Sequence, residues 1–236
     1  MKKSIIIILI ILVVGAGLWF VLFNTNQINR NQKPITGSES GTVAIVNGEK
    51  IDRSDLEAQF AQVKQMYSQQ NLTSDQEKQL KDQMLDQLIG SVLLKQEAKE
   101  QAITLDQGEI DTQMNQMIQN LGGEEKLNQQ LQQAGLTKKE LRDNMKEQLL
   151  VQEYIGSKIS DEQLNVTDED LESYYEQMSA MQQGVGTQTE TPTFGEITDT
   201  QKQQLRSQLK QQKRSVEIQK LIEELKKNAD ISKLNK

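Results

Sequence analysis

The sequence predicts a mainly α-helical protein that carries a short β-hairpin and a single N-terminal transmembrane helix. Apolar residues recur at helical spacing along most of the chain, between glycines and helix-capping residues. Apolar residues make up 35% and aromatic residues 4% of the 236 residues, which favours an open helical protein over a large buried sheet. A third observation, one uninterrupted apolar segment near the start, predicts the membrane helix.

That apolar segment is SIIIILIILVVGAGLWFVLF, residues 4–23, which contains no charged side chain. At ~1.5 Å per residue, a helix of this length crosses a hydrocarbon layer ~30 Å thick. Lys2 and Lys3 predict a cytoplasmic N-terminus, so we interpret residues 1–23 as an uncleaved signal anchor. A cleaved signal peptide is the alternative, and both interpretations export the rest of the chain. The expected location is the cell membrane, with one span, an extracytoplasmic domain and a flexible tether at residues 24–41.

The amino-acid composition excludes several classes of catalytic and metal-binding chemistry. The chain has neither Cys nor His, which excludes disulfides, thiol catalysis, thiolate metal ligands and an imidazole acid or base. It has no glycine-rich phosphate loop or nucleophile motif, so we expect no catalytic residue, no metal site and no cofactor. From residue 42 onward it carries 23 basic and 33 acidic residues, a net charge of about −10 that disfavours nucleic-acid binding.

A β-hairpin is predicted directly after the tether, at the start of the domain expected for residues 42–236. Residues 43–46 are rich in β-branched side chains, and residues 49–51 can return as a second strand. Asn47-Gly48 between them favours a type I′ turn, because both residue types tolerate positive φ.

Helices follow the hairpin, and each predicted helix has a start or stop signal. Capping residues precede runs of apolar residues at helical spacing, and pairs three residues apart form capping boxes. The start signals are Asp52, Ser74-x-x-Glu77, Thr104 or Asp106, Thr137-x-x-Glu140 and Thr167-x-x-Asp170. The stop signals are Gly122-Gly123 and Gly135.

The last part of the chain is predicted to be a loop, a long helix and a strand. Residues 182–198 are rich in Gly, Thr and Pro, as loops are. The final helix is expected from about residue 199 to residue 228, and residues 230–232 are the candidate strand.

The apolar residues of this final helix change face along its length. Leu205, Leu209 and Val216 share one side, whereas the apolar residues from 218 to 225 lie on the opposite side. We therefore expect one helix with two packing partners. A break near Ser215 is the alternative.

Three blocks of the sequence resemble a known family. VAIVNGEKIDRSDLEAQF, GLTKKELRDNMKEQLLVQEYI and VTDEDLESYYEQ occur in the order and spacing of signature blocks in the N-terminal chaperone domain of SurA-type periplasmic chaperones and PrsA-type foldases. The resemblance implies a multi-helix SurA-like chaperone domain. It also implies a small β clasp, in which the first strand pairs with a strand at the end of the domain, here NADIS.

The chain departs from that family at one place. Catalytic members carry a parvulin-type peptidyl-prolyl isomerase domain between the ESYYE helix and the final helix, where this chain has only residues 182–198. A further domain needs ~50 residues, and parvulin sites also include histidines. The resemblance therefore implies a non-catalytic relative of the isomerase foldases, with an isomerase of unrecognised site as the less favoured alternative.

The expected function is that of a membrane-anchored chaperone for unfolded, exported polypeptides. Methionine suits a cleft that accepts varied clients because its side chain is unbranched and polarisable. Ordinary helix core is the alternative role for each candidate. The candidate client-binding residues are Met66, Met84, Met114, Met117, Met145, Met178, Met181 and Phe194.

A second class of function also fits the composition. A membrane-tethered helical scaffold would use its helices to bind a defined partner, and sustained heptads with charged flanks would favour it. Glycine stops and broad apolar stripes interrupt any such repeat. The sequence is compatible with a homodimer and does not define the set of clients.

Overall fold

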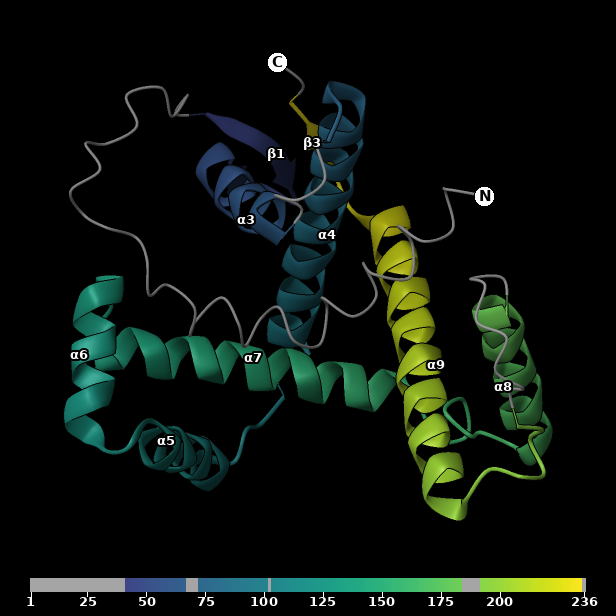
Figure 1. Cartoon of the computed structure of the whole chain (residues 1–236). Coiled ribbons are helices and arrows are strands. Elements are labelled where there is room, and N and C mark those ends of the chain that lie inside the picture. The colour runs from purple at the N-terminus through teal and green to yellow at the C-terminus, as the bar shows by residue number, and fades with distance from the viewer. Residues whose placement is uncertain (1–40, 67–71, 102, 184–191, 235–236) are drawn as a thin grey trace. The chain divides into compact units, whose positions relative to one another are not determined.

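The structure is a computed structural model that describes residues 41–66, 72–101, 103–183 and 192–234 (Figure 1). The chain divides into two compact units. One unit spans residues 156–221, and the other comprises the described residues up to Ile155 and from Ile222 onward. The predicted membrane segment and tether lie outside the described residues. None of the helices within the described ranges combines the length and the apolar character needed to cross a membrane.

The described ranges contain seven helices and three strands, which confirms a mainly helical fold with a small sheet. The helices are α3 (Arg53–Met66), α4 (Ser74–Glu100), α5 (Gln107–Leu121), α6 (Glu124–Ala134), α7 (Lys138–Lys158), α8 (Asp168–Gln183) and α9 (Asp199–Asn228). The strands are β1 (Thr42–Val46), β2 (Glu49–Asp52) and β3 (Ile231–Lys233).

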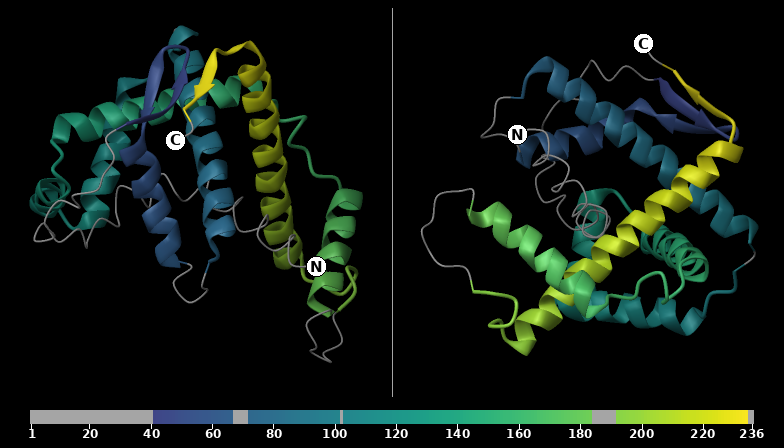
Figure 2. Two further views of the ribbon diagram at one scale, coloured as in Figure 1. Left: turned by 90° about the horizontal axis from the view of Figure 1, so that it is seen from above. Right: turned by 90° about the vertical axis from the view of Figure 1, so that its right-hand side faces the viewer.

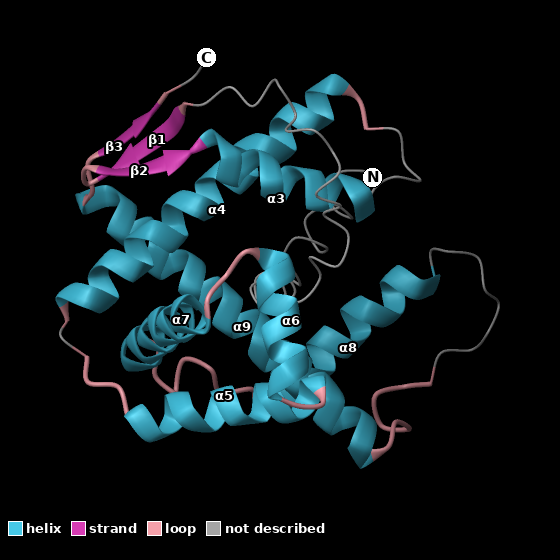
Figure 3. Cartoon of the chain, turned by 90° about the vertical axis from the view of Figure 1, so that its left-hand side faces the viewer, coloured by secondary structure: helices cyan, strands magenta, loops and turns pink. Residues whose placement is uncertain are grey.

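The three strands form one antiparallel sheet in the order β2-β1-β3, so the two ends of the described chain meet (Figure 3). β1 pairs with β3 through Ala44↔Lys233, Ile45↔Ser232 and Val46↔Ile231. Figure 2 shows α9 leading into β3 beside the hairpin. The predicted clasp is therefore confirmed, with the last strand one residue later than expected.

The hairpin turn has the backbone that its residues favour. Asn47 has φ of 49° and Gly48 has φ of 86°, both in the left-handed region that a type I′ turn requires. The Asn47 side chain also donates from Nδ2 to Gln96 Oε1 at 2.9 Å, and Gln96 Nε2 donates to the Val46 carbonyl at 3.1 Å. Because Gln96 is on α4, these bonds attach the turn to that helix.

The unit that contains the sheet, called the sheet unit, has its main core where α3 and α4 pack on each other and on the hairpin. Ile89 and Leu93 of α4 are almost fully buried there, as are Ala44 and Val46 of β1. Leu225, from the end of α9, packs against the same core. Helices α5, α6 and α7 surround a second core in this unit, made of Met114, Leu127, Leu131, Leu141 and Met145.

Most predicted helix boundaries are confirmed, and one capping box is corrected. Asp106 caps α5, and Gly122 and Gly135 follow the last residues of α5 and α6. The box at α4 consists of Thr73 and Gln76 instead of Ser74 and Glu77. Thr73 has an extended backbone, so its hydroxyl reaches the Gln76 N–H while Ser74 is already the first helical residue.

Helix α9 is continuous from Asp199 to Asn228, so the alternative of a break near Ser215 is wrong. Leu205 belongs to the core of the unit that spans residues 156–221, and Leu225 packs in the core of the sheet unit. The expectation of one helix with two packing partners is confirmed. Val216, however, is 45% exposed, although the helical pattern places it on the face of Leu205.

Candidate functional site

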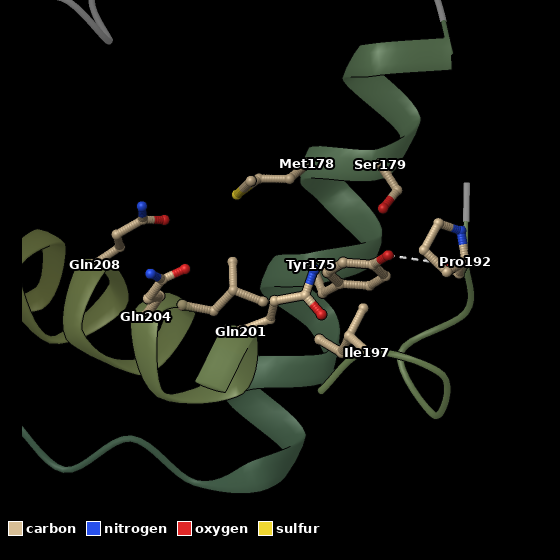
Figure 4. Close-up of a pocket in the computed structure, with 9 residues that line it drawn as sticks. Tyr175, Met178, Ser179, Pro192, Ile197, Gln201, Gln204 and Gln208 are labelled. Carbon is tan, nitrogen blue, oxygen red and sulfur yellow. Dashed lines mark hydrogen bonds between the residues drawn. The ribbon is translucent and has the colours of Figure 1, made fainter. Parts of the chain in front are cut away.

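A pocket of about 310 Å³ lies in the unit of residues 156–221 (Figure 4). Three segments form its walls: the middle of α8, residues 192–197, and the first turns of α9. The lining residues are Tyr175, Met178, Ser179, Pro192, Ile197, Gln201, Gln204, Leu205 and Gln208.

Two reciprocal turns bring the chain from the pocket wall into α9. The Thr193 backbone N–H donates to Glu196 Oε2 at 2.7 Å, and this bond holds the pKa of Glu196 below its usual value. The Thr198 backbone N–H and hydroxyl both donate to Gln201 Oε1, at 2.8 and 3.0 Å. Gln201 is therefore a capping residue at the start of α9.

The floor of the pocket is apolar. Leu171, Ile197 and Leu205 are buried together, and Tyr175 and Met178 of α8 pack against them. The Tyr175 hydroxyl donates to the Pro192 carbonyl at 2.6 Å, which joins α8 to the segment before α9. This bond anchors one wall of the pocket, as the dashed line in Figure 4 shows.

An aromatic contact supports that wall from behind. The rings of Tyr175 and Phe194 have centroids 5.9 Å apart and are tilted by 51°. Lys202 Nζ lies 4.9 Å from the Phe194 ring centroid, within the range of a cation–π contact. Phe194 is thus held next to the pocket without lining it.

Ion pairs hold α8 and α9 together away from the lining residues. Lys213 Nζ donates to Asp170 Oδ2 at 2.8 Å, and the Thr167 backbone N–H donates to the same oxygen at 3.1 Å. These bonds, the one from Lys213 first, lower the pKa of Asp170. Arg206 pairs with Asp168 at 2.5 Å. Lys213 and Arg206 of α9 are therefore directed to the acidic first turn of α8.

The chemistry of the pocket is that of a binding site. Its lining offers apolar surface, two hydroxyl groups and three side-chain amides, and no carboxylate, ammonium or guanidinium group. In the part of the chain that the structure describes, no group of acidic residues is arranged to hold a metal ion. The arrangement favours the binding of a neutral, partly apolar ligand.

The structure places the predicted client-binding residues in different surroundings. Met178 lines the pocket and Phe194 is adjacent to it. Met84 is buried in the core of α3, α4 and the sheet. Met114 and Met145 are buried in the core of α5, α6 and α7, and Met117 packs against that core. The side chains of Met66 in α3 and Met181 in α8 lie outside the described part of the structure.

Sequence reasoning overlooked the polar half of the pocket. Gln204 and Gln208 are four residues apart on α9, beside Leu205 rather than on the apolar face itself. The available signal was this pair of glutamines next to a buried leucine. Tyr175 packs between its helix and the core and also lines the pocket.

Comparison with known proteins shows what the chain resembles. Residues 1–155 match the model of the SurA-like N-terminal domain. A foldase protein PrsA of Clostridium botulinum (strain 657 / Type Ba4) is 28% identical over 165 residues, which cover 64% of this chain and 48% of that protein. A foldase protein PrsA of Clostridium kluyveri is 31% identical over 183 residues, which cover 70% and 53%. The chain thus spans about half the length of these relatives.

Proposed function

The chain belongs to the SurA-like N-terminal domain family, and we propose that it is a membrane-anchored, extracytoplasmic chaperone that binds unfolded exported polypeptides. The family match over residues 1–155 is the observation that carries this proposal. The foldase names of the relatives support a role in protein folding. In this proposal the chain binds clients, and the clients dissociate spontaneously.

We assign the chain binding and no isomerase chemistry. Helix α8 ends at Gln183 and α9 begins at Asp199, so the segment between the ESYYE helix and the final helix is much shorter than the ~50 residues of a small domain. The sequence contains no histidine to serve in a parvulin-like site. The pocket beside α8 contributes apolar and amide groups, which suit the retention of a client more than proton transfer.

Clients are proposed to contact an apolar surface that includes the pocket. Met178 is half-buried in its wall, where an unbranched side chain can adjust to different client residues. The strongly acidic character of the chain, with a net charge of −7, keeps the surroundings soluble and limits unspecific adhesion. Phe194 extends the aromatic part of the same cluster.

Anchoring at the membrane rests on residues 4–23, which are uncharged and long enough to span a bilayer. The two lysines before this segment favour a cytoplasmic N-terminus and an exported domain. A tether between the span and β1 would leave the domain free to meet polypeptides as they emerge from the membrane.

Two assays run side by side test the proposal. The full chain, in nanodiscs, is added to a chemically unfolded client and aggregation is followed by light scattering. The same preparation is added in catalytic amounts to a protein whose refolding is limited by proline isomerisation. We expect suppression of aggregation and no acceleration of the proline step. Acceleration would contradict the non-catalytic assignment, and unchanged aggregation would contradict the chaperone function itself.

A further inference from the structure

We infer that the pocket lined by α8 and α9 is a subsite for one bulky apolar side chain of an uncharged, extended client segment. This inference rests on the proposed function and adds to it the chemical class of segment that this site selects. The pocket belongs wholly to residues 156–221, beyond the end of the family match at residue 155.

The lining is the first reason. Charged residues make up 26% of the sequence, yet none of the nine lining residues is charged. A charged client side chain in this pocket would lose water without gaining an ionic partner from the lining, and such a transfer is costly. A neutral apolar side chain loses nothing of this kind and buries apolar surface on the half-buried Tyr175 and Met178.

The arrangement of α9 is the second reason. Its glutamines at positions 204 and 208 line the pocket, whereas the basic residues of the same turns are used elsewhere. Lys202 lies over the Phe194 ring, and Arg206 pairs with Asp168 of α8. The helix therefore presents amides to the pocket and cations to other partners.

The size of the pocket and its rim set the kind of ligand. A volume of about 310 Å³ is at the lower end of ligand pockets, so it suits one side chain of a longer segment rather than a folded surface. Gln204 and Gln208 are exposed, and each side-chain amide offers donors and an acceptor to the backbone of an extended peptide. Figure 4 shows Met178 reaching from α8 toward the side where these glutamines lie.

Peptide binding to the full chain tests the inference. The probes are capped Gly-Ser-Xaa-Ser-Gly peptides with Phe, Leu, Asp or Lys at Xaa, and the readout is NMR of ¹³C-methyl-labelled methionine. The Met178 signal, assigned with the Met178→Leu variant, should shift with the Phe and Leu peptides. Their affinity should exceed that of the Asp and Lys peptides by about tenfold or more. The buried Met84 and Met114 serve as internal controls whose signals should stay in place.

A charge variant separates selection by the pocket from general stickiness. Gln204→Glu combined with Gln208→Glu gives the pocket negative charge at two exposed positions, so the preference for the Phe peptide over the Lys peptide should fall by about tenfold or reverse. Gln203→Glu places one negative charge on an exposed α9 residue that does not line the pocket, and it should keep the preference of the unmodified chain. Thermal unfolding shows whether all three chains remain folded.

The outcomes distinguish this inference from the proposed function. If the chain suppresses aggregation but the Met178 signal shifts with none of the peptides, the pocket is not the subsite and the chaperone function stands. Equal preferences in the double variant and in Gln203→Glu would overturn the inference in the same way. Failure to suppress aggregation bears on the proposed function, whatever the peptides do.

Discussion

Asn47 and Asp230 exchange two hydrogen bonds, each 2.8 Å between donor and acceptor, across 183 positions of sequence. The Asn47 backbone N–H donates to the Asp230 carbonyl, and the Asp230 N–H donates to Asn47 Oδ1. The Asn47 side chain, at the hairpin turn, therefore binds the backbone just after the end of α9. This pair closes the clasp before the first residue of β3.

Replacement of Asn47 by alanine should destabilise the clasp by about 2–3 kcal/mol, because alanine adopts the left-handed region less readily than asparagine and lacks the side-chain hydrogen bonds. Urea unfolding of the full chain measures this. Asn47→Gly separates the two causes, since it tolerates the φ of 49° but also lacks the side chain. Equal stability of Asn47→Ala and the unmodified chain would show that the turn does not hold the C-terminal segment.

Proline in β3 should be harmful at only one of two adjacent positions. The Asn47 N–H donates to the Asp230 carbonyl, and the Leu234 N–H donates to the Val43 carbonyl. In an antiparallel pair, hydrogen-bonded and non-hydrogen-bonded residue pairs alternate. The pair midway between these two, Ile45 and Ser232, is therefore hydrogen-bonded, and the Ser232 N–H points toward β1. Ser232→Pro should cost about 1–3 kcal/mol in urea unfolding.

Lys233→Pro is the matched control, because the N–H of Lys233 points to the free edge of the sheet. It loses only the exposed ion pair with Asp86, which is worth about 1 kcal/mol at most. Equal losses from the two prolines would contradict the register of the clasp.

Gly90 of α4 should resist replacement by alanine. A Cβ at this position would lie 2.9 Å from Ile222 Cγ2, so the usual gain of about 1 kcal/mol for Gly→Ala in a helix should turn into a loss. In the Ile222→Ala background, Gly90→Ala should regain its stabilising effect.

Gly156→Ala provides the comparison, since a Cβ at Gly156 of α7 meets no atom within 4 Å. It should stabilise the chain by about 0.5–1 kcal/mol in the same unfolding assay. A stabilising Gly90→Ala in the unmodified chain would mean that Ile222 does not pack on α4 as described.

The pairing of α8 with α9 should weaken in acid. Bonds from Lys213 and Thr167 lower the pKa of Asp170, so its carboxylate stabilises the folded state above the pKa of the unfolded chain. That stabilisation is lost as the pH falls below about 4 and through the lowered pKa. Hydrogen exchange of α8 at pH 7 and at pH 3 should show faster opening at the lower pH.

Asp170→Asn should remove most of this pH dependence. It should speed the opening of α8 at pH 7, where the carboxylate is charged in the unmodified chain, and change it little at pH 3. Glu172→Gln, an exposed change on the same helix, should leave the profile of the unmodified chain. The same acid response in Asp170→Asn as in the unmodified chain would assign the effect to other carboxylates.

Membrane topology is open to a direct test. Protease added to spheroplasts should degrade the region after residue 23, and the mature chain should keep residues 1–23, because we propose an uncleaved anchor with an exported domain. Mass spectrometry of the mature N-terminus is the measurement. A chain that starts near Asn24 would indicate a cleaved signal peptide and a released chaperone.

Sequence reasoning was strongest where an element depends on near neighbours. Asn47-Gly48 predicted its turn, and Thr137-x-x-Glu140 and Thr167-x-x-Asp170 form the expected reciprocal bonds. It was less certain where two neighbours can do the same task, as at α4, where Thr73 takes the capping role expected of Ser74. Such choices depend on backbone dihedrals that composition does not specify.

The sequence by itself determined the helices, most of their caps and the hairpin turn, because those signals act between residues a few positions apart. Only the tertiary structure decided which apolar residues are covered. Met84, Met114 and Met145 went into cores while Met178 reached a pocket, although all four have the same side chain. Helical spacing defines a face, but burial depends on which distant segment packs against that face, and this is why Val216 stays exposed where Leu205 does not.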